Sequence, residues 1–291
     1  MSLVHAITAE HSRLRRWSLY IIARYLEMPL LALGYHILRG RYRRLGENRL
    51  VRAVISWCVV APFGYAGDTA RAMPTPQVLQ LIEDLEGSIA VGPCRCRTAH
   101  RACDHPLETD IVIRTGVEAW TRAFPQEYRL ISKDEAKEIV SDCSRQGLWQ
   151  MVFVHCPVEA HREARDMERA HAHEHAHTHE DARTHEDART HEHSHASGNE
   201  YVICNCCACG CVPYILNRDL GQRVYPLLRG TYVAHTDLER CTGHGGCVAA
   251  CPFDVRALED GKARLVDACF GCGVCVASCP EGAVAMVEAE A

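Results

Sequence analysis

The chain has 291 residues, 47% of them hydrophobic, which is enough for two or three compact units and excludes the composition of a disordered protein. Its 18 cysteines are many for this length, but a chain this long, with no export signal at its start, is not expected to be a small secreted disulfide scaffold. The net charge of -5 is unevenly distributed, because the first 55 residues hold ten arginines and residues 236–291 hold nine acids against four bases. We therefore expect metal-binding cysteines in a chain whose two ends carry opposite charge.

Residues 1–75 are predicted to form a basic, apolar helical segment. Its two apolar runs, 17–38 and 50–65, are interrupted by charges or proline, so neither supplies the roughly 20 uncharged residues of a membrane span. Two interpretations stay open: buried helices of a small unit, or an interfacial amphipathic anchor that uses the RGRYRR cluster from Arg39. We expect a cytoplasmic protein whose basic head meets a membrane surface or an acidic partner. Nucleic acid is not expected, because no recognised nucleic-acid module accompanies the basic stretch.

Residues 76–158 are predicted to form a helical, cysteine-rich domain. In SKDEAKEIVSDCSRQG, Ser132 is a helix cap with Glu135 three residues later, and Gly147 is the stop signal. The following LWQMVFVH is typical of a short buried strand, although a run of this length does not differ in pattern from buried helix.

Residues 159–200 form a histidine-rich segment that is predicted to be a flexible linker. It contains two copies of THEDAR, has almost no large apolar residue, and holds nine histidines between His171 and His195. Weak binding of Ni or Zn is one interpretation, and a solvated spacer is the other.

The last segment, residues 236–291, carries the most specific motif. The spacing CxxCxxCxxxCP is the bacterial ferredoxin run, in which three cysteines bind one iron–sulfur cube and the fourth binds the neighbouring cube. Glycines in the loop let backbone amides approach the sulfurs. The four cysteines are Cys269, Cys272, Cys275 and Cys279.

A second copy of the motif lies upstream, with His244 in place of one cysteine. It contains Cys241, His244, Cys247 and Cys251, followed by Pro252. The pair of motifs resembles the dicluster bacterial ferredoxins from about Ala234 to Val287, and the resemblance implies a ferredoxin-like βαββαβ unit in an α+β protein. It also implies two [4Fe-4S] clusters: the first on Cys241, His244, Cys247 and Cys279, the second on Cys269, Cys272, Cys275 and Cys251.

The role of His244 is open at this point. Imidazole can bind iron, and replacing a thiolate by a neutral histidine raises the reduction potential. If His244 does not bind, the first site holds a [3Fe-4S] cluster or a cube with an open corner, or it holds no cluster.

More cysteines remain in GPCRCRTAHRACDHP and in ICNCCACGC, which lies in the segment 201–235 that is expected to complete the middle domain. The pairing resembles a family of larger iron–sulfur proteins in which CxCR, CDHP and ICNCC stretches precede a dicluster ferredoxin. We expect the two stretches to meet at a third iron–sulfur centre, with zinc and free thiols as alternatives. His100 and His105 are interpreted as hydrogen-bonding neighbours, and Arg95 and Arg97 as charges that offset the cluster. The candidate ligands are Cys94, Cys96, Cys103, Cys206, Cys207 and Cys209.

These patterns favour an electron carrier or redox-complex subunit over a stand-alone enzyme. No phosphate loop, dinucleotide fingerprint or nucleophile elbow is present. The ferredoxin unit is expected to exchange single electrons with a redox partner protein. Two alternatives are a reductase whose third cluster is catalytic and a metal-handling protein that uses the histidine-rich segment.

Overall fold

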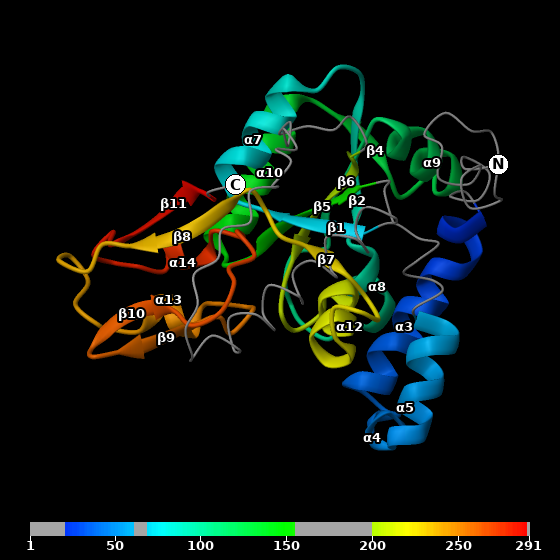
Figure 1. The fold of residues 1–291 in the computed structure, drawn as a ribbon. Coiled ribbons are helices and arrows are strands. Elements are labelled where there is room, and N and C mark those ends of the chain that lie inside the picture. Colours follow the sequence, from blue (N-terminus) through cyan, green and yellow to red (C-terminus); the bar gives the residue numbers. More distant parts are fainter. Residues whose placement is uncertain (1–20, 61–68, 155–199, 290–291) are drawn as a thin grey trace, which may run out of the picture.

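The middle of the protein is a seven-stranded mixed sheet in a computed structural model that describes residues 21–60, 69–154 and 200–289 (Figure 1). The strand order is β4-β2-β3-β6-β5-β1-β7, and every pair is antiparallel except β1 with β7. The strands are β1 (Thr69–Met73), β2 (Ile89–Pro93), β3 (Glu108–Ile113), β4 (Arg129–Ile131), β5 (Trp149–Val154), β6 (Glu200–Cys206) and β7 (Leu227–Leu228).

Helices cover both faces of this sheet. The helices α7 (Thr75–Asp84) and α10 (Lys133–Arg145) pack on one face, where Ile89, Ile111 and Ile203 meet them in a fully apolar core. On the other face α9 (Thr115–Ala123) packs against the alternate residues of the same strands. The central strands are buried on both sides, so they read as continuous apolar runs.

The helical middle domain expected over 76–158 was therefore wrong in its architecture, although the coarse α+β class holds. IAVGP and ETDIVI are strands, and short apolar runs buried on both faces have no period that separates them from buried helix. Two local predictions are confirmed. The α10 helix is capped by Ser132, whose Oγ accepts from the Glu135 N–H at 3.1 Å, and LWQMVFVH contains β5.

The chain after the histidine-rich segment returns to the centre of the same sheet. Strand β6 lies between β3 and β5, with Asp110 opposite Cys204 and Trp149 opposite Cys206. The histidine-rich segment itself lies outside the described residues, apart from Glu200. This topology brings the two middle cysteine stretches, which are about a hundred residues apart in sequence, to one end of the sheet.

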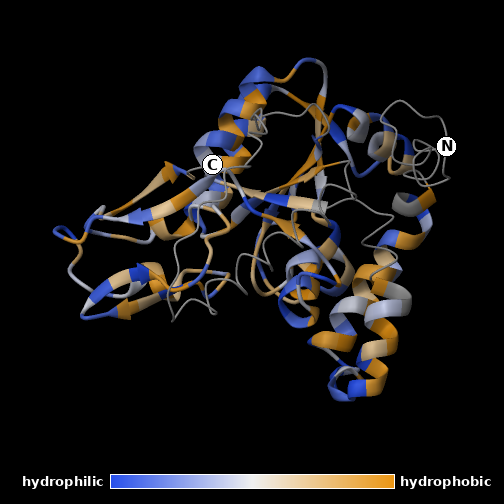
Figure 2. Cartoon of the chain, viewed as in Figure 1, coloured by the Kyte–Doolittle hydropathy of each residue, from blue (hydrophilic) through white to orange (hydrophobic). Residues whose placement is uncertain are grey.

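The N-terminal segment is helical where it is described, and Figure 2 shows hydrophobic residues along much of it. Within residues 21–60, 69–154 and 200–289, no helix has both the length and the apolar character needed to span a membrane. Helix α3 packs on α8 (Arg95–His100) and on α12 (Val212–Leu220). The N-terminal elements are η1 (Ile22–Leu26), α3 (Glu27–Leu38), α4 (Arg43–Glu47), α5 (Arg49–Ile55) and η2 (Ser56–Val60).

The C-terminal unit has the element order β-α-β-β-α-β. Strands β8 and β11 pair with each other, and β9 and β10 form a hairpin at the opposite end, as Figure 1 shows in orange and red. Strand β8 begins four residues before the expected boundary at 236. The elements are β8 (Tyr232–Thr236), α13 (Gly246–Ala249), β9 (Arg256–Glu259), β10 (Lys262–Leu265), α14 (Val274–Ala277) and β11 (Val284–Glu288).

Candidate metal centres

The two cysteine loops of the C-terminal unit have the same backbone conformation. Gly245 and Gly273 occupy matching positions just before α13 and α14, with φ angles of 81° and 78°. Gly243 and Gly271 match in the same way, at 77° and 79°. Glycine adopts this left-handed region without steric cost. The sequence repeat is thus a structural repeat, and each loop presents its side chains at equivalent positions.

Four predicted ligands line one small cavity in the C-terminal unit. Cys251 comes from the first loop, whereas Cys269, Cys272 and Cys275 come from the second. This is the arrangement in which one cysteine of each motif crosses to the other cluster. Burial raises the pKa of Cys272 and raises that of Cys275 to about 11, because an apolar environment disfavours a lone thiolate. Coordination to a metal removes this penalty, since a bound thiol is deprotonated.

A buried arginine in the same cavity also fits an anionic cluster. Arg256 is 4% exposed and lines the cavity beside the cysteines. Its Nη2 donates to Thr236 Oγ1, but its Nε and Nη1 have no hydrogen-bond partner among the described residues. A buried cation without a counter-charge is unfavourable. A cluster held by four thiolates would supply that negative charge, so the residues present fit an iron–sulfur cube.

Backbone amides point at several of the loop sulfurs. Such N–H donors stabilise the thiolate and the reduced state of a cluster. Hydrogen bonds from the Ala263 and Gly243 amides lower the pKa of Cys241. The described contacts are Ala263 N to Cys241 Sγ at 3.5 Å, Gly271 N to Cys269 Sγ at 3.4 Å, and Ala283 N to Cys279 Sγ at 3.3 Å.

The first loop differs from the second at His244. The matching Cys272 is buried, whereas His244 is exposed. The His244 ring lies over Gly246, where any side chain would collide with it and with the Ser278 carbonyl oxygen. The ring therefore lies beside Gly246 and Ser278, the residues that precede Cys247 and Cys279 in the chain. Both cysteines are predicted ligands of the first cluster, and ligation by His244 stays a prediction.

By their nearest thiol contacts, the middle cysteines fall into two groups. The inner thiol group consists of Cys94, Cys96, Cys204, Cys206 and Cys211. The outer thiol group consists of Cys103, His105, Cys207 and Cys209, whose ligand atoms all lie within 4.8 Å of one another. Cys94 and Cys96 thus lie in a different group from Cys103, and Cys206 lies in a different group from its neighbour Cys207.

The inner thiol group lies on the sheet face that α3 and α12 cover, where Cys206 and Cys211 are buried and the other three thiols are partly buried. Cys206 Sγ and Cys211 Sγ are 3.4 Å apart, and Cys96 also contacts Cys211. Cys211 is the N-cap of α12, and its contacts with Cys206 and Cys96 lower its pKa. The contact with Cys211 and burial raise the pKa of Cys96, and contacts with Cys204 and Cys211 raise that of Cys206. Cys204 donates to Asp110 Oδ1 at 3.2 Å.

Cys204, Cys211 and His105 were not among the ligands predicted from the sequence, although each belongs to one of these groups. Strand alternation was the available signal for Cys204, because it lies two residues from Cys206 and so shares its face. His100 is a hydrogen-bonding neighbour, as expected: its Nε2 bonds the Gly210 carbonyl at 2.8 Å, and its ring stacks on Tyr35. No pattern in the sequence distinguished His105 from it.

Two arginines beside the thiols have different roles. Arg97 is 1% exposed, donates from Nη1 to the Asn205 carbonyl at 2.9 Å, and places the same atom 3.9 Å from Cys207 Sγ. Burial disfavours its charge, but nearby thiols, including Cys94 and Cys207, raise its pKa overall. Arg95 turns away and pairs with Glu27 at 2.9 Å. Of the two predicted charge partners, only Arg97 contacts a thiol in the structure.

Aromatic side chains connect the inner thiol group to the cavity of the second cluster. Cys206, Cys211 and Cys272 belong to one packed cluster of side chains. Phe253 and Phe270 line the cluster cavity and stack with their ring centroids 4.1 Å apart. The contacts of Phe253 toward the sheet are Tyr214, at 5.6 Å between centroids, and Trp149, at 6.1 Å. The C-terminal unit is thus joined to the middle domain through apolar contact at this point.

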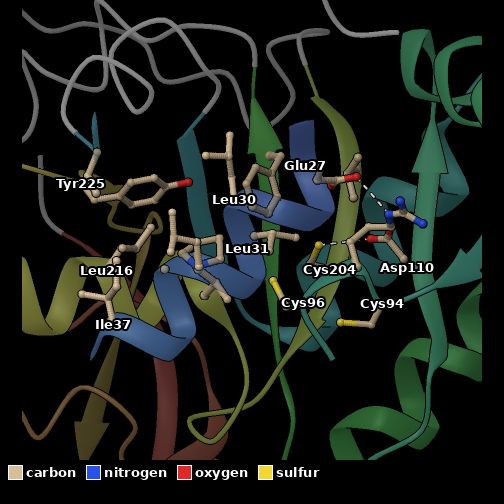
Figure 3. Close-up of a pocket in the computed structure, with 18 of the residues that line it drawn as sticks. Glu27, Leu30, Leu31, Ile37, Cys94, Cys96, Asp110, Cys204, Leu216 and Tyr225 are labelled. Carbon is tan, nitrogen blue, oxygen red and sulfur yellow. Dashed lines mark hydrogen bonds and ion pairs between the residues drawn. The ribbon is translucent and has the colours of Figure 1, made fainter. Parts of the chain in front are cut away.

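An apolar cavity of about 240 Å³ adjoins the inner thiol group. Figure 3 shows Tyr225 and Leu216 toward one end and Cys96 and Cys204 toward the other, with Leu30 and Leu31 between them. Glu27 and Asp110 are the acids that line the cavity, and desolvation raises the pKa of both. The pKa of Glu27 rises to about 7, against the lowering effect of its partner Arg95.

Among the described residues, Cys143 belongs to neither thiol group. Cys143 is a buried thiol that is 2% exposed and packs against Leu148 and Cys207. The side chains of Cys58 and Cys156 lie outside the described part of the chain.

Comparison with known proteins identifies one segment. Residues 234–280 match the family model described as a 4Fe-4S dicluster domain. No curated protein and no solved structure matches the chain.

Proposed function

Because residues 234–280 match a 4Fe-4S dicluster domain, which supports an iron–sulfur electron-transfer role, we propose that the chain passes single electrons between two [4Fe-4S] clusters and a third iron–sulfur centre on the inner thiol group. The residues that would hold the clusters are those of the two loops. The clusters supply the redox chemistry, and the protein positions them and sets their potentials.

The contact between Cys272 and the inner thiol group through aromatic side chains carries this proposal. Electron tunnelling slows steeply with distance and is faster through packed atoms than across a gap. Phe270 and Phe253 fill the space next to the second cluster, and Tyr214 and Trp149 continue the packing to Cys206. The Tyr214 hydroxyl also donates to the Pro252 carbonyl, which fixes the first loop against α12.

The spacing of the inner thiols favours a two-iron cluster over a cube. The 3.4 Å between Cys206 Sγ and Cys211 Sγ is close to the separation of two thiolates on one iron, whereas ligands of a cube stand roughly 6 Å apart. Cys96 and Cys204 are the nearest candidates for the second iron. Cys94 is the fifth thiol of the group.

Iron counting after a paired substitution tests the proposal. The wild-type chain purified without oxygen should hold about ten irons, eight in the dicluster unit and two in the inner group. Cys206→Ser with Cys211→Ser should leave about eight, whereas the control Cys143→Ala should keep ten. Equal iron content in the wild type and the paired variant would reject a third centre. Twelve irons per chain would indicate a four-iron cube in the inner thiol group in place of a two-iron cluster.

A reductase is the second candidate, and the apolar cavity is the observation that favours it. The cavity gives an organic electron acceptor access to Cys96 and Cys204, with Glu27 as a proton donor near neutral pH. Leu31→Trp would fill the cavity, and the matched control Leu265→Trp would alter an exposed residue instead. If the protein is a reductase, only Leu31→Trp should slow reoxidation of the reduced chain by a small quinone. Equal rates would reject this candidate.

We assign partner docking to the two charged ends of the chain. The acidic C-terminal unit suits a basic surface on a redox protein. The N-terminal helices expose Leu50 (75%) and Trp57 (59%) near several arginines, which suits peripheral contact with an anionic membrane. Co-sedimentation with anionic vesicles, lost in Trp57→Ser and absent with zwitterionic vesicles, would support that contact. No binding to either would reject it.

A further inference from the structure

The outer thiol group is the most compact set of metal ligands in the described residues. Cys103 and His105 follow α8, and Cys207 and Cys209 follow β6. All four ligand atoms lie within 4.8 Å of one another. Neither the inner thiols nor the ferredoxin cysteines form a set of three or more this compact within residues 21–60, 69–154 and 200–289. We therefore consider a single metal ion, and not an iron–sulfur cluster, as the ligand of the outer thiol group.

The distances match a tetrahedron around one ion. Metal–ligand distances of about 2.3 Å for sulfur and about 2.0 Å for nitrogen imply edges of about 3.8 Å between two sulfurs and about 3.5 Å between sulfur and nitrogen. Cys103 Sγ and Cys207 Sγ are 3.8 Å apart, and Cys209 Sγ and His105 Nδ1 are 3.5 Å apart. A cube needs roughly 6 Å between its ligand sulfurs, so it does not fit between these atoms.

We infer that Cys103, His105, Cys207 and Cys209 bind a single zinc ion, in a site separate from every iron–sulfur centre. Three thiolates and one imidazole are a common closed ligand set of structural zinc, with no position left for water or substrate. Three thiolates and Zn²⁺ leave one net negative charge. The buried guanidinium of Arg97, 3.9 Å from Cys207 Sγ, offsets it.

The site joins two loops that the chain itself leaves far apart. Cys103 and Cys207 are separated by 104 residues, which include the whole histidine-rich segment. Closing so long a loop with an ion removes much of the conformational entropy of the unfolded chain. The hydrogen bond from His100 to the Gly210 carbonyl links the same two loops. The zinc ion thus holds Cys96 of α8 against Cys206 and Cys211, which positions the inner thiol group.

X-ray absorption at the zinc edge of the full chain tests the inference directly. The expected spectrum has three sulfur neighbours at about 2.3 Å and one nitrogen at about 2.0 Å. Metal analysis should give about one zinc per chain, and deletion of residues 171–195 should leave it in place. A shell of nitrogen and oxygen alone, lost with that deletion, would assign the zinc to the histidine-rich segment and overturn the inference.

Variants separate this site from the proposed electron-transfer function. Cys209→Ser should lower zinc from about one per chain to near zero while iron stays at its wild-type value. The control Cys143→Ala changes a neighbouring buried thiol outside the ligand set and should keep both metals. If Cys209→Ser removes iron and the wild type holds no zinc, the group binds iron and the zinc assignment is wrong. The zinc content of Cys209→Ser is measured independently of the iron content, so a dicluster unit with fewer than eight irons would leave the zinc test valid.

Discussion

Arg256→Gln is expected to make the second cluster of the C-terminal unit harder to reduce. Arg256 is 4% exposed, lines the cavity beside four cysteines, and has two nitrogen atoms without a partner among the described residues. An added electron on the cluster is attracted by this fixed positive charge. Glutamine keeps the hydrogen-bonding capacity toward Thr236 but removes the charge, so the reduced state loses a stabilising interaction.

The magnitude follows from the position of the guanidinium at the cavity wall. If the separation is taken as roughly 6 Å, a charge and the added electron interact by roughly 3 kcal/mol at an effective dielectric constant of about 20. For a one-electron couple about 1.4 kcal/mol corresponds to about 59 mV. Solvent relaxation reduces the effect, so we expect the potential to fall by about 100 mV.

Redox titration monitored by EPR measures this shift, with Arg264→Gln as the matched control. Arg264 carries the same charge in the neighbouring strand β10 but is exposed, so solvent and salt screen it. The control should move the potential by less than about 20 mV. Equal shifts in the two variants, with iron content unchanged, would refute the placement of Arg256 against the cluster.

Three further outcomes are expected. His244→Cys should give the first cluster a more negative potential if His244 is a ligand, and an unchanged EPR spectrum and potential would reject ligation. Phe253→Leu should slow electron transfer from the second cluster to the inner thiol group in flash-reduction kinetics without moving either potential; an unchanged rate would exclude this aromatic contact from the route. Glu27 has its folded pKa raised from 4.5 to about 7, so the folded state binds the extra proton and wild-type stability falls as pH rises through that window. Thermal unfolding should therefore show Glu27→Gln gaining up to about 3 kcal/mol relative to wild type between pH 4.5 and 7, and a constant difference would contradict the raised pKa.

The ferredoxin loops could be predicted from sequence because their function depends on local spacing. Short fixed offsets between cysteines, glycines with positive φ and a proline after each last cysteine all lie within twelve residues. The resemblance to dicluster ferredoxins then implies that Cys251 belongs to the second site, and these four cysteines line one cavity in the structure. The capped helix α10 could be predicted for the same reason, since Ser132 and Glu135 are three residues apart.

The middle domain could not be predicted in the same way, because the order of strands in its sheet depends on pairing between segments that are distant in sequence. Strand β6 enters between β3 and β5 from beyond the histidine-rich segment, and nothing local specifies this register. That register decides which cysteines meet. Cys206 and Cys207 are adjacent in sequence, yet the end of β6 sends them to different groups, toward Cys211 and toward Cys103.

EPR of the full chain, purified without oxygen and reduced with dithionite, tests the central claim most directly. We expect a brown protein whose reduced spectrum shows paramagnetic iron–sulfur signals broadened by the magnetic interaction of neighbouring clusters. A colourless protein without such signals, carrying zinc or no metal in the loops at 241–252 and 269–280, would contradict it.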